Sequence, residues 1–109
     1  MGHEYQDRCS LEFGRIIAAG LPDHPEWLQL AKDNLVRWSE RNPDAPGLLR
    51  CYREWLEILE QPLKEICEIL TAETDEGQRL RQNSPFAGAI HYKTVWQIKK
   101  RLRHDANPT

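Results

Sequence analysis

The side chains that could carry out chemistry in this sequence are its acidic residues, its four histidines and its three cysteines. Carboxylates stand three residues apart in two pairs, Glu54 with Glu57 and Glu65 with Glu68. Neighbouring carboxylates can act as general acid and general base. A basic residue stands directly before each pair, and mixed charges are typical of a helix face that is exposed to water. The pattern therefore favours solvated charge over an acid–base site.

The histidines and serines form no known catalytic or metal-binding motif. A di-metal site in a helical bundle needs Glu-x-x-His pairs, and no glutamate stands three residues before any histidine. The Arg-x-x-x-x-His arrangement of helical ribonuclease-type toxins is also missing. No serine lies in a Gly-x-Ser-x-Gly setting, and the sequence contains no P-loop and no Gly-x-Gly-x-x-Gly loop. We therefore expect a protein that is not an enzyme and that uses no metal or cofactor.

The three cysteines are Cys9, Cys51 and Cys67, an odd number without a Cys-x-x-Cys pair or a zinc-binding spacing. Each stands among apolar neighbours in a segment with helical spacing, where a free thiol behaves as a small apolar side chain. The alternative is a thiolate nucleophile in which Cys51 or Cys67 is paired with His91. No nearby charge that would lower the pKa of a thiol is evident, so we expect buried, unreactive thiols.

The elements that must position these residues are helices, because apolar residues recur at steps of three and four along most of the chain. No segment shows the strict alternation of a strand. Pro62 interrupts one helical stretch, and we favour two helices in succession there over one kinked helix. The sequence predicts an all-α, compact, irregular bundle of five or six short helices. Residues 1–104 are expected to form one helical domain, followed by a frayed C-terminal tail over residues 105–109.

The predicted helices have identifiable ends. The first helix is expected to end with Gly20 as its C-terminal cap. For the second helix, Asp23 and Glu26 have the spacing of a capping box. Thr74 or Asp75 should cap a short and largely exposed fifth helix. The expected helices cover residues 4–19, 26–41, 48–60, 63–70, 75–81 and 91–103. The four tryptophans, Trp27, Trp38, Trp55 and Trp96, are expected to supply much of the core.

Charge is distributed unevenly along the chain of 109 residues, which has a formal net charge of −2. Residues 1–76 contain 16 acidic and 8 basic residues, whereas residues 77–109 contain 7 basic residues and a single acidic one. Such a division into an acidic body and a basic end is typical of a protein with a charged partner. The alternative is a solvated helix whose basic last turn complements the helix macrodipole.

The basic end defines the candidate partner-binding residues: Arg79, Arg81, Tyr92, Lys93, Trp96, Lys99, Lys100, Arg101 and Arg103. Tryptophan, tyrosine and arginine are enriched at interface hot spots, which favours a protein partner, including a second copy of the chain. As an alternative, the same cations could contact phosphates of a nucleic acid while the aromatic rings stack on bases. Trp96 is compatible with either a core or a surface position.

The segment Glu76–Gly88, with the Trp96-x-Ile98 that follows, resembles a group of short helical bacterial proteins. Some of these proteins look like members of two-gene toxin and antitoxin modules. The resemblance implies a bacterial accessory protein that acts by binding a partner, and it implies no catalytic residue. We therefore expect a small helical protein-binding or regulatory module, antitoxin-like in character. The alternative function is a nucleic-acid-associated regulator.

Membrane association is not expected from the sequence. No apolar run approaches the roughly 18 residues that a membrane-spanning helix requires. The N-terminus also lacks the basic segment followed by an apolar segment that a signal peptide has. We expect a cytoplasmic protein.

Overall fold

The computed structural model describes residues 4–106, and this part of the chain folds into six α-helices without a β-strand. The helices are α1 (Glu4–Gly20), α2 (Glu26–Arg41), α3 (Pro46–Leu59), α4 (Leu63–Thr71), α5 (Asp75–Arg81) and α6 (Tyr92–Ala106). The all-α prediction is therefore confirmed, as is the break between two helices at Pro62. This proline occupies the N-cap position of α4, where its lack of an N–H has no cost.

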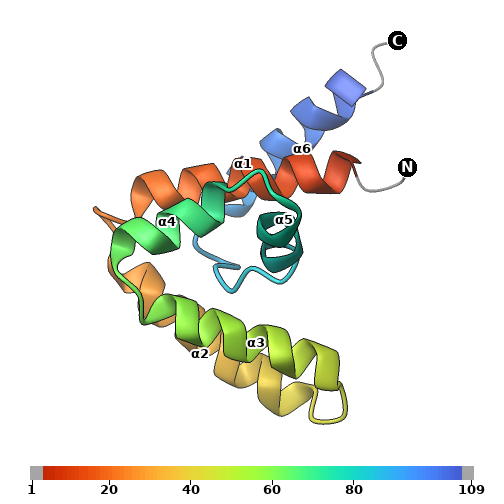
Figure 1. Ribbon diagram of the computed structural model, residues 1–109. Coiled ribbons are helices and arrows are strands. Elements are labelled where there is room, and N and C mark those ends of the chain that lie inside the picture. The colour runs from red at the N-terminus through yellow and green to blue at the C-terminus, as the bar shows by residue number, and fades with distance from the viewer. Residues whose placement is uncertain (1–3, 107–109) are drawn as a thin grey trace.

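The helices pack in two layers that are joined through the middle of the chain (Figure 1). Helices α2 and α3 lie side by side as a hairpin, because the connecting loop is only four residues long. Helix α4 returns along α1, and α5 packs against both. Helix α6 crosses α1 and extends beyond it, away from the α2–α3 hairpin (Figure 1).

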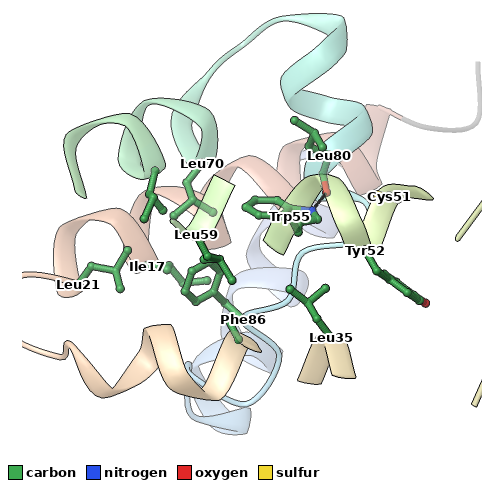
Figure 2. Packing of buried hydrophobic residues seen from close by; sticks show 12 residues of the cluster. Ile17, Leu21, Leu35, Cys51, Tyr52, Trp55, Leu59, Leu70, Leu80 and Phe86 are labelled. Carbon is green, nitrogen blue, oxygen red and sulfur yellow. Dashed lines mark hydrogen bonds between the residues drawn. The ribbon is translucent and has the colours of Figure 1, made fainter. Parts of the chain in front are cut away.

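The main core is centred on Trp55, which is fully buried (Figure 2). Its indole Nε1 donates a hydrogen bond of 2.9 Å to the carbonyl oxygen of Leu80, so the ring joins α3 to α5. The edge of its ring also meets Phe86 at a centroid distance of 6.3 Å. The expectation that all four tryptophans supply the core is wrong for Trp96, which is 61% exposed, and Trp27 and Trp38 are only partly buried.

Helix α6 rests on a second, smaller cluster that is separate from the main core. Its buried members are Cys9 of α1 and Ile98 and Leu102 of α6, and Phe13 of α1 packs against them. The hydroxyl group of Tyr5 donates a hydrogen bond of 2.9 Å to the backbone carbonyl of Lys99. This apolar face attaches α6 to α1.

The loop before α6 is held by Asn34 of α2, which is almost completely buried. Its side-chain amide donates hydrogen bonds to the carbonyl oxygens of Pro85 and Ala87, at 2.8 and 3.0 Å. Phe86 is thereby fixed in the main core. At the end of the same loop, the imidazole Nδ1 of His91 accepts a hydrogen bond of 3.2 Å from the backbone N–H of Lys93, in the first turn of α6.

Several helix ends differ from the sequence prediction. The predicted capping box is not formed, because Pro25 occupies the N-cap position of α2. Glu26 instead pairs with His24 at 3.0 Å. This hydrogen bond lowers the pKa of the Glu26 carboxyl group. Helix α3 begins at Pro46 because proline is favoured in the first helical turn. Helix α6 includes positions 105 and 106 of the predicted tail, while residues 1–3 and 107–109 lie outside the described part of the chain.

Helix α5 matches its predicted cap but not its predicted exposure. The Thr74 hydroxyl oxygen accepts a hydrogen bond of 3.0 Å from the backbone N–H of Gly77, as expected for an N-cap residue. However, Gly77, Leu80 and Arg81 are all buried, because the helix packs against both α1 and α4. A Cβ atom on Gly77 would lie 2.6 Å from the carbonyl oxygen of Ala72, so the close approach of α5 requires glycine there.

Candidate functional site

The nine candidate partner-binding residues do not form one continuous surface. Arg79 of α5 lies apart from α6 and is engaged within the protein. Its guanidinium group donates to the Glu54 carboxylate at 2.6 Å and also to the Glu76 carboxylate. These hydrogen bonds raise the pKa of Arg79 further above its usual range and lower the pKa of Glu76. Arg79 therefore links α5 to α3, and part of its charge is already compensated.

The sequence prediction is wrong for Arg81, because this residue is not at the surface. Only 3% of Arg81 is exposed, and its Nη1 donates to the carbonyl oxygen of Ala72 at 2.5 Å and to that of Ile69 at 3.4 Å. Burial lowers the pKa of its guanidinium group, since a charge is poorly stabilised away from water. An arginine in the last turn of a short helix is normally exposed, and only the packing of α1 and α4 around α5 reveals the difference.

Three cations of α6 lie on the sides of the helix that face the rest of the molecule. Arg101 pairs with Glu12 of α1 at 3.6 Å. Lys99 and Arg103 line a cavity between α1 and α6, and the Arg103 guanidinium carbon lies 5.8 Å from the centroid of the Tyr5 ring. These side chains remain accessible to solvent.

Four residues form the outward side of α6, and we call them the α6 outer face: Tyr92, Lys93, Trp96 and Lys100. Tyr92 is 72% exposed and stands one helical turn before Trp96. The Lys100 ammonium nitrogen lies 4.9 Å from the centroid of the Trp96 ring, a cation–π contact. Tyr92, Lys93 and Trp96 also line a shallow hollow of about 340 Å³ together with Gln97.

The chemistry of the α6 outer face is that of a binding surface. Tryptophan and tyrosine carry large apolar areas that a partner can remove from water, and both residues are enriched at interface hot spots. The positions from Tyr92 to His104 contain no acidic residue, so the local potential is positive. Among the described residues, the other exposed large apolar side chains are Val36 of α2 and Leu63 of α4, on other helices.

The structure also locates the cysteines and the groups that could bind a metal. Cys51 is buried in the main core, and the Cys67 thiol donates to the carbonyl oxygen of Ala18 at 3.6 Å. His91 is exposed and stacks on Tyr92, with ring centroids 4.6 Å apart. Burial raises the pKa of both the Cys51 and the Cys67 thiol, which is the opposite of what a thiolate nucleophile requires. Within residues 4–106, no three or more His, Cys, Asp or Glu side chains cluster as metal ligands.

The raised thiol pKa values predict a loss of stability in alkaline solution. Above the ordinary thiol pKa, the unfolded chain releases its thiol protons while the folded chain retains those of Cys51 and Cys67. The free energy of unfolding should therefore fall as the pH rises through this range. Urea unfolding at pH values of about 7.5 and about 9.5, on either side of the ordinary thiol pKa, measures the decrease. The double variant Cys51→Ala/Cys67→Ala should show a smaller decrease, and an unchanged decrease would contradict the prediction.

Comparison of the chain with protein-family models, with curated proteins and with solved structures finds no match. None of the helices in the described part of the chain is both long enough and apolar enough to cross a bilayer. The fold and the surface therefore define a small all-α protein with an exposed aromatic and basic helix face.

Proposed function

We propose that this protein is a binding module that recognises an acidic surface on a partner protein through the α6 outer face. The observation that carries the proposal is the exposure of Trp96, with 61% of its surface open to solvent on a helix free of acidic residues from position 92 to 104. The resemblance of Glu76–Gly88 to antitoxin-like bacterial proteins favours a regulatory role for such a complex. We place this role in the cytoplasm.

The arrangement of aromatic and basic groups matches what an acidic protein surface needs. Covering the Trp96 and Tyr92 rings would remove about 150 to 250 Å² from water for each ring that is fully buried. Lys93 and Lys100 flank these rings and would meet carboxylates at the rim of the contact. Such charges increase the rate of association and select the partner, while the aromatic rings supply most of the affinity.

A nucleic acid is a weaker candidate for the same surface. Residues 1–76 have a formal charge of −8, which repels a phosphate backbone as it approaches the body of the molecule. Two of the predicted phosphate contacts, Arg79 and Arg101, are already paired with carboxylates, and Arg81 is buried. Fewer free cations therefore remain in the basic end of the chain than the sequence implied.

The proposal predicts that Trp96→Ala weakens partner binding by about 30-fold without unfolding the protein, because a truncated hot-spot residue costs about 2 kcal/mol. The tagged protein is captured from its own cells with and without nuclease. A stoichiometric protein that survives nuclease is then purified and titrated against the variants by calorimetry. Lys93→Glu/Lys100→Glu should also weaken binding, mainly through slower association.

Two matched controls test whether the α6 outer face itself is responsible. Val36→Ala removes an exposed apolar side chain from α2, and Lys64→Glu reverses an exposed charge on α4. Both should bind the partner as the parent does. Equal binding by Trp96→Ala and the parent would reject the proposed surface. Recovery of nucleic acid, with affinity that falls steeply as salt is raised, would favour the nucleic-acid alternative, because phosphate contacts release counterions.

A further inference from the structure

A cavity of about 520 Å³ lies between α1 and α6, beside the C-terminal end of α5. We call it the α1–α6 cavity. Tyr5 and Phe13 line its α1 side, Lys99 and Arg103 line its α6 side, and Arg81 lines it from α5. The described side chains around it include three cations and no acidic residue. This composition is that of a site for an anion with an apolar part.

A second hollow of about 340 Å³ adjoins the α1–α6 cavity, and both are lined by Phe13, Arg81 and Gln82. Most of its remaining lining is apolar and includes Phe86 and Val95. Arg81 therefore stands where a more basic space meets a more apolar one. A ligand with one charged end and a flat apolar body fits this combination in chemical terms.

The hydrogen bonding of Arg81 leaves one edge of its guanidinium group without a partner in the described part of the chain. Nη1 is used by the carbonyl oxygens of Ala72 and Ile69. Nε and Nη2 are buried and have no hydrogen-bond partner among the described residues. These two nitrogens form one side of the planar guanidinium, and their parallel N–H groups match the two oxygens of a carboxylate. A buried cation with unmade hydrogen bonds is costly, so an anion that satisfies them gains affinity.

Asp7 of α1 is the other group to consider, because its charge acts on Arg81 through space and its Oδ1 is also buried without a partner in the described structure. Glu73 acts on Arg81 in the same way. No hydrogen bond joins Arg81 to either carboxylate, so the Nε–Nη2 edge is not closed by these residues. Lys99 and Arg103 add two further positive charges on the opposite side of the cavity.

We infer that the α1–α6 cavity binds a small organic carboxylate, with the carboxylate on the Nε–Nη2 edge of Arg81 and the apolar body against Phe13. Lys99 and Arg103 at the cavity wall attract the anion. The inference is independent of the α6 outer face, because Lys93 and Lys100 do not line this cavity.

The experiment titrates the full chain with benzoate and with benzamide, its uncharged counterpart, and follows the protein by two-dimensional NMR. Benzoate should bind at least about tenfold more tightly than benzamide, because hydrogen bonds to a charged group are the stronger ones. The Arg81 Nε–H resonance should move on addition of benzoate. Arg81→Lys, which keeps the charge but loses the two parallel donors, should weaken benzoate binding by about tenfold or more.

Exposed variants keep the test decisive if Arg81→Lys fails to fold. Lys99→Gln/Arg103→Gln should weaken benzoate binding by about three- to tenfold, since each removes a nearby positive charge. Lys93→Gln/Lys100→Gln, on the α6 outer face, should leave it unchanged. The proposal is overturned if benzamide binds as well as benzoate, if inorganic phosphate binds more tightly than benzoate, or if no binding is seen at tens of millimolar. It is also overturned if the Arg81 Nε–H resonance responds to Asp7→Asn but not to benzoate, because Asp7 would then be its partner.

Discussion

Replacing Trp55 with alanine is expected to lower the free energy of unfolding by about 4 kcal/mol, a loss that is typical when large buried aromatic residues are truncated. Trp55 is completely buried at the centre of the main core. Its loss would open a cavity among residues of several helices and remove the hydrogen bond to the carbonyl oxygen of Leu80. Since small domains are stabilised by only about 5–15 kcal/mol, this variant should be close to unfolded.

Urea denaturation followed by circular dichroism measures this loss. Trp55→Phe is the informative companion, because it keeps a ring in the core but leaves the Leu80 carbonyl oxygen without its donor. The Trp55→Phe variant should lose less stability than Trp55→Ala. It should lose more than a conservative core substitution does, because a buried acceptor without a partner costs about 1–3 kcal/mol. Trp96→Ala serves as the surface control and should change the stability by less than about 0.5 kcal/mol. A stable Trp55→Ala protein would show that Trp55 is not the centre of the core.

Gly14→Ala is expected to have the second largest effect, a loss of about 3 kcal/mol in the free energy of unfolding, at the upper end for overpacking. A Cβ atom at this position would lie 2.0 Å from the backbone carbonyl oxygen of Leu70 and 3.1 Å from the Cδ of Arg81. Because a backbone atom is the obstacle, no side-chain rotation relieves the contact. Helices α1 and α4 must move apart, which outweighs the gain of about 1 kcal/mol from replacing a helical glycine with alanine.

The matched control is Gly47→Ala, since Gly47 also lies in a helix but has no heavy atom within 4 Å of a Cβ placed there. This variant should be as stable as the parent or slightly more stable. Both variants are compared by thermal unfolding under the same conditions. Equal stability of Gly14→Ala and Gly47→Ala would show that α1 and α4 are not packed as closely as the structure places them.

The sequence by itself determined the elements of this protein, because the causes of helix formation are local. Apolar residues at steps of three and four predicted every helix except α5, which was predicted from its N-cap, and Pro62 marked the break between α3 and α4. Thr74 and Asp75 were the two candidates for this cap, and Thr74 fills the role, which depends only on residues within one turn. The turn that carries Phe86 is different, because its anchor, Asn34, lies far away in the sequence.

Only the tertiary structure decided which side chains are buried and which are exposed, because burial depends on neighbours that are distant along the chain. Arg81 and Arg101 belong to the same basic end of the sequence, yet Arg81 is buried between helices and Arg101 is exposed beside Glu12. Trp55 and Trp96 are both tryptophans on amphipathic helices, but α3 is surrounded by other helices and α6 is attached along one face. The α1–α6 cavity likewise exists only because α1, α5 and α6 meet, which no local pattern in the sequence records.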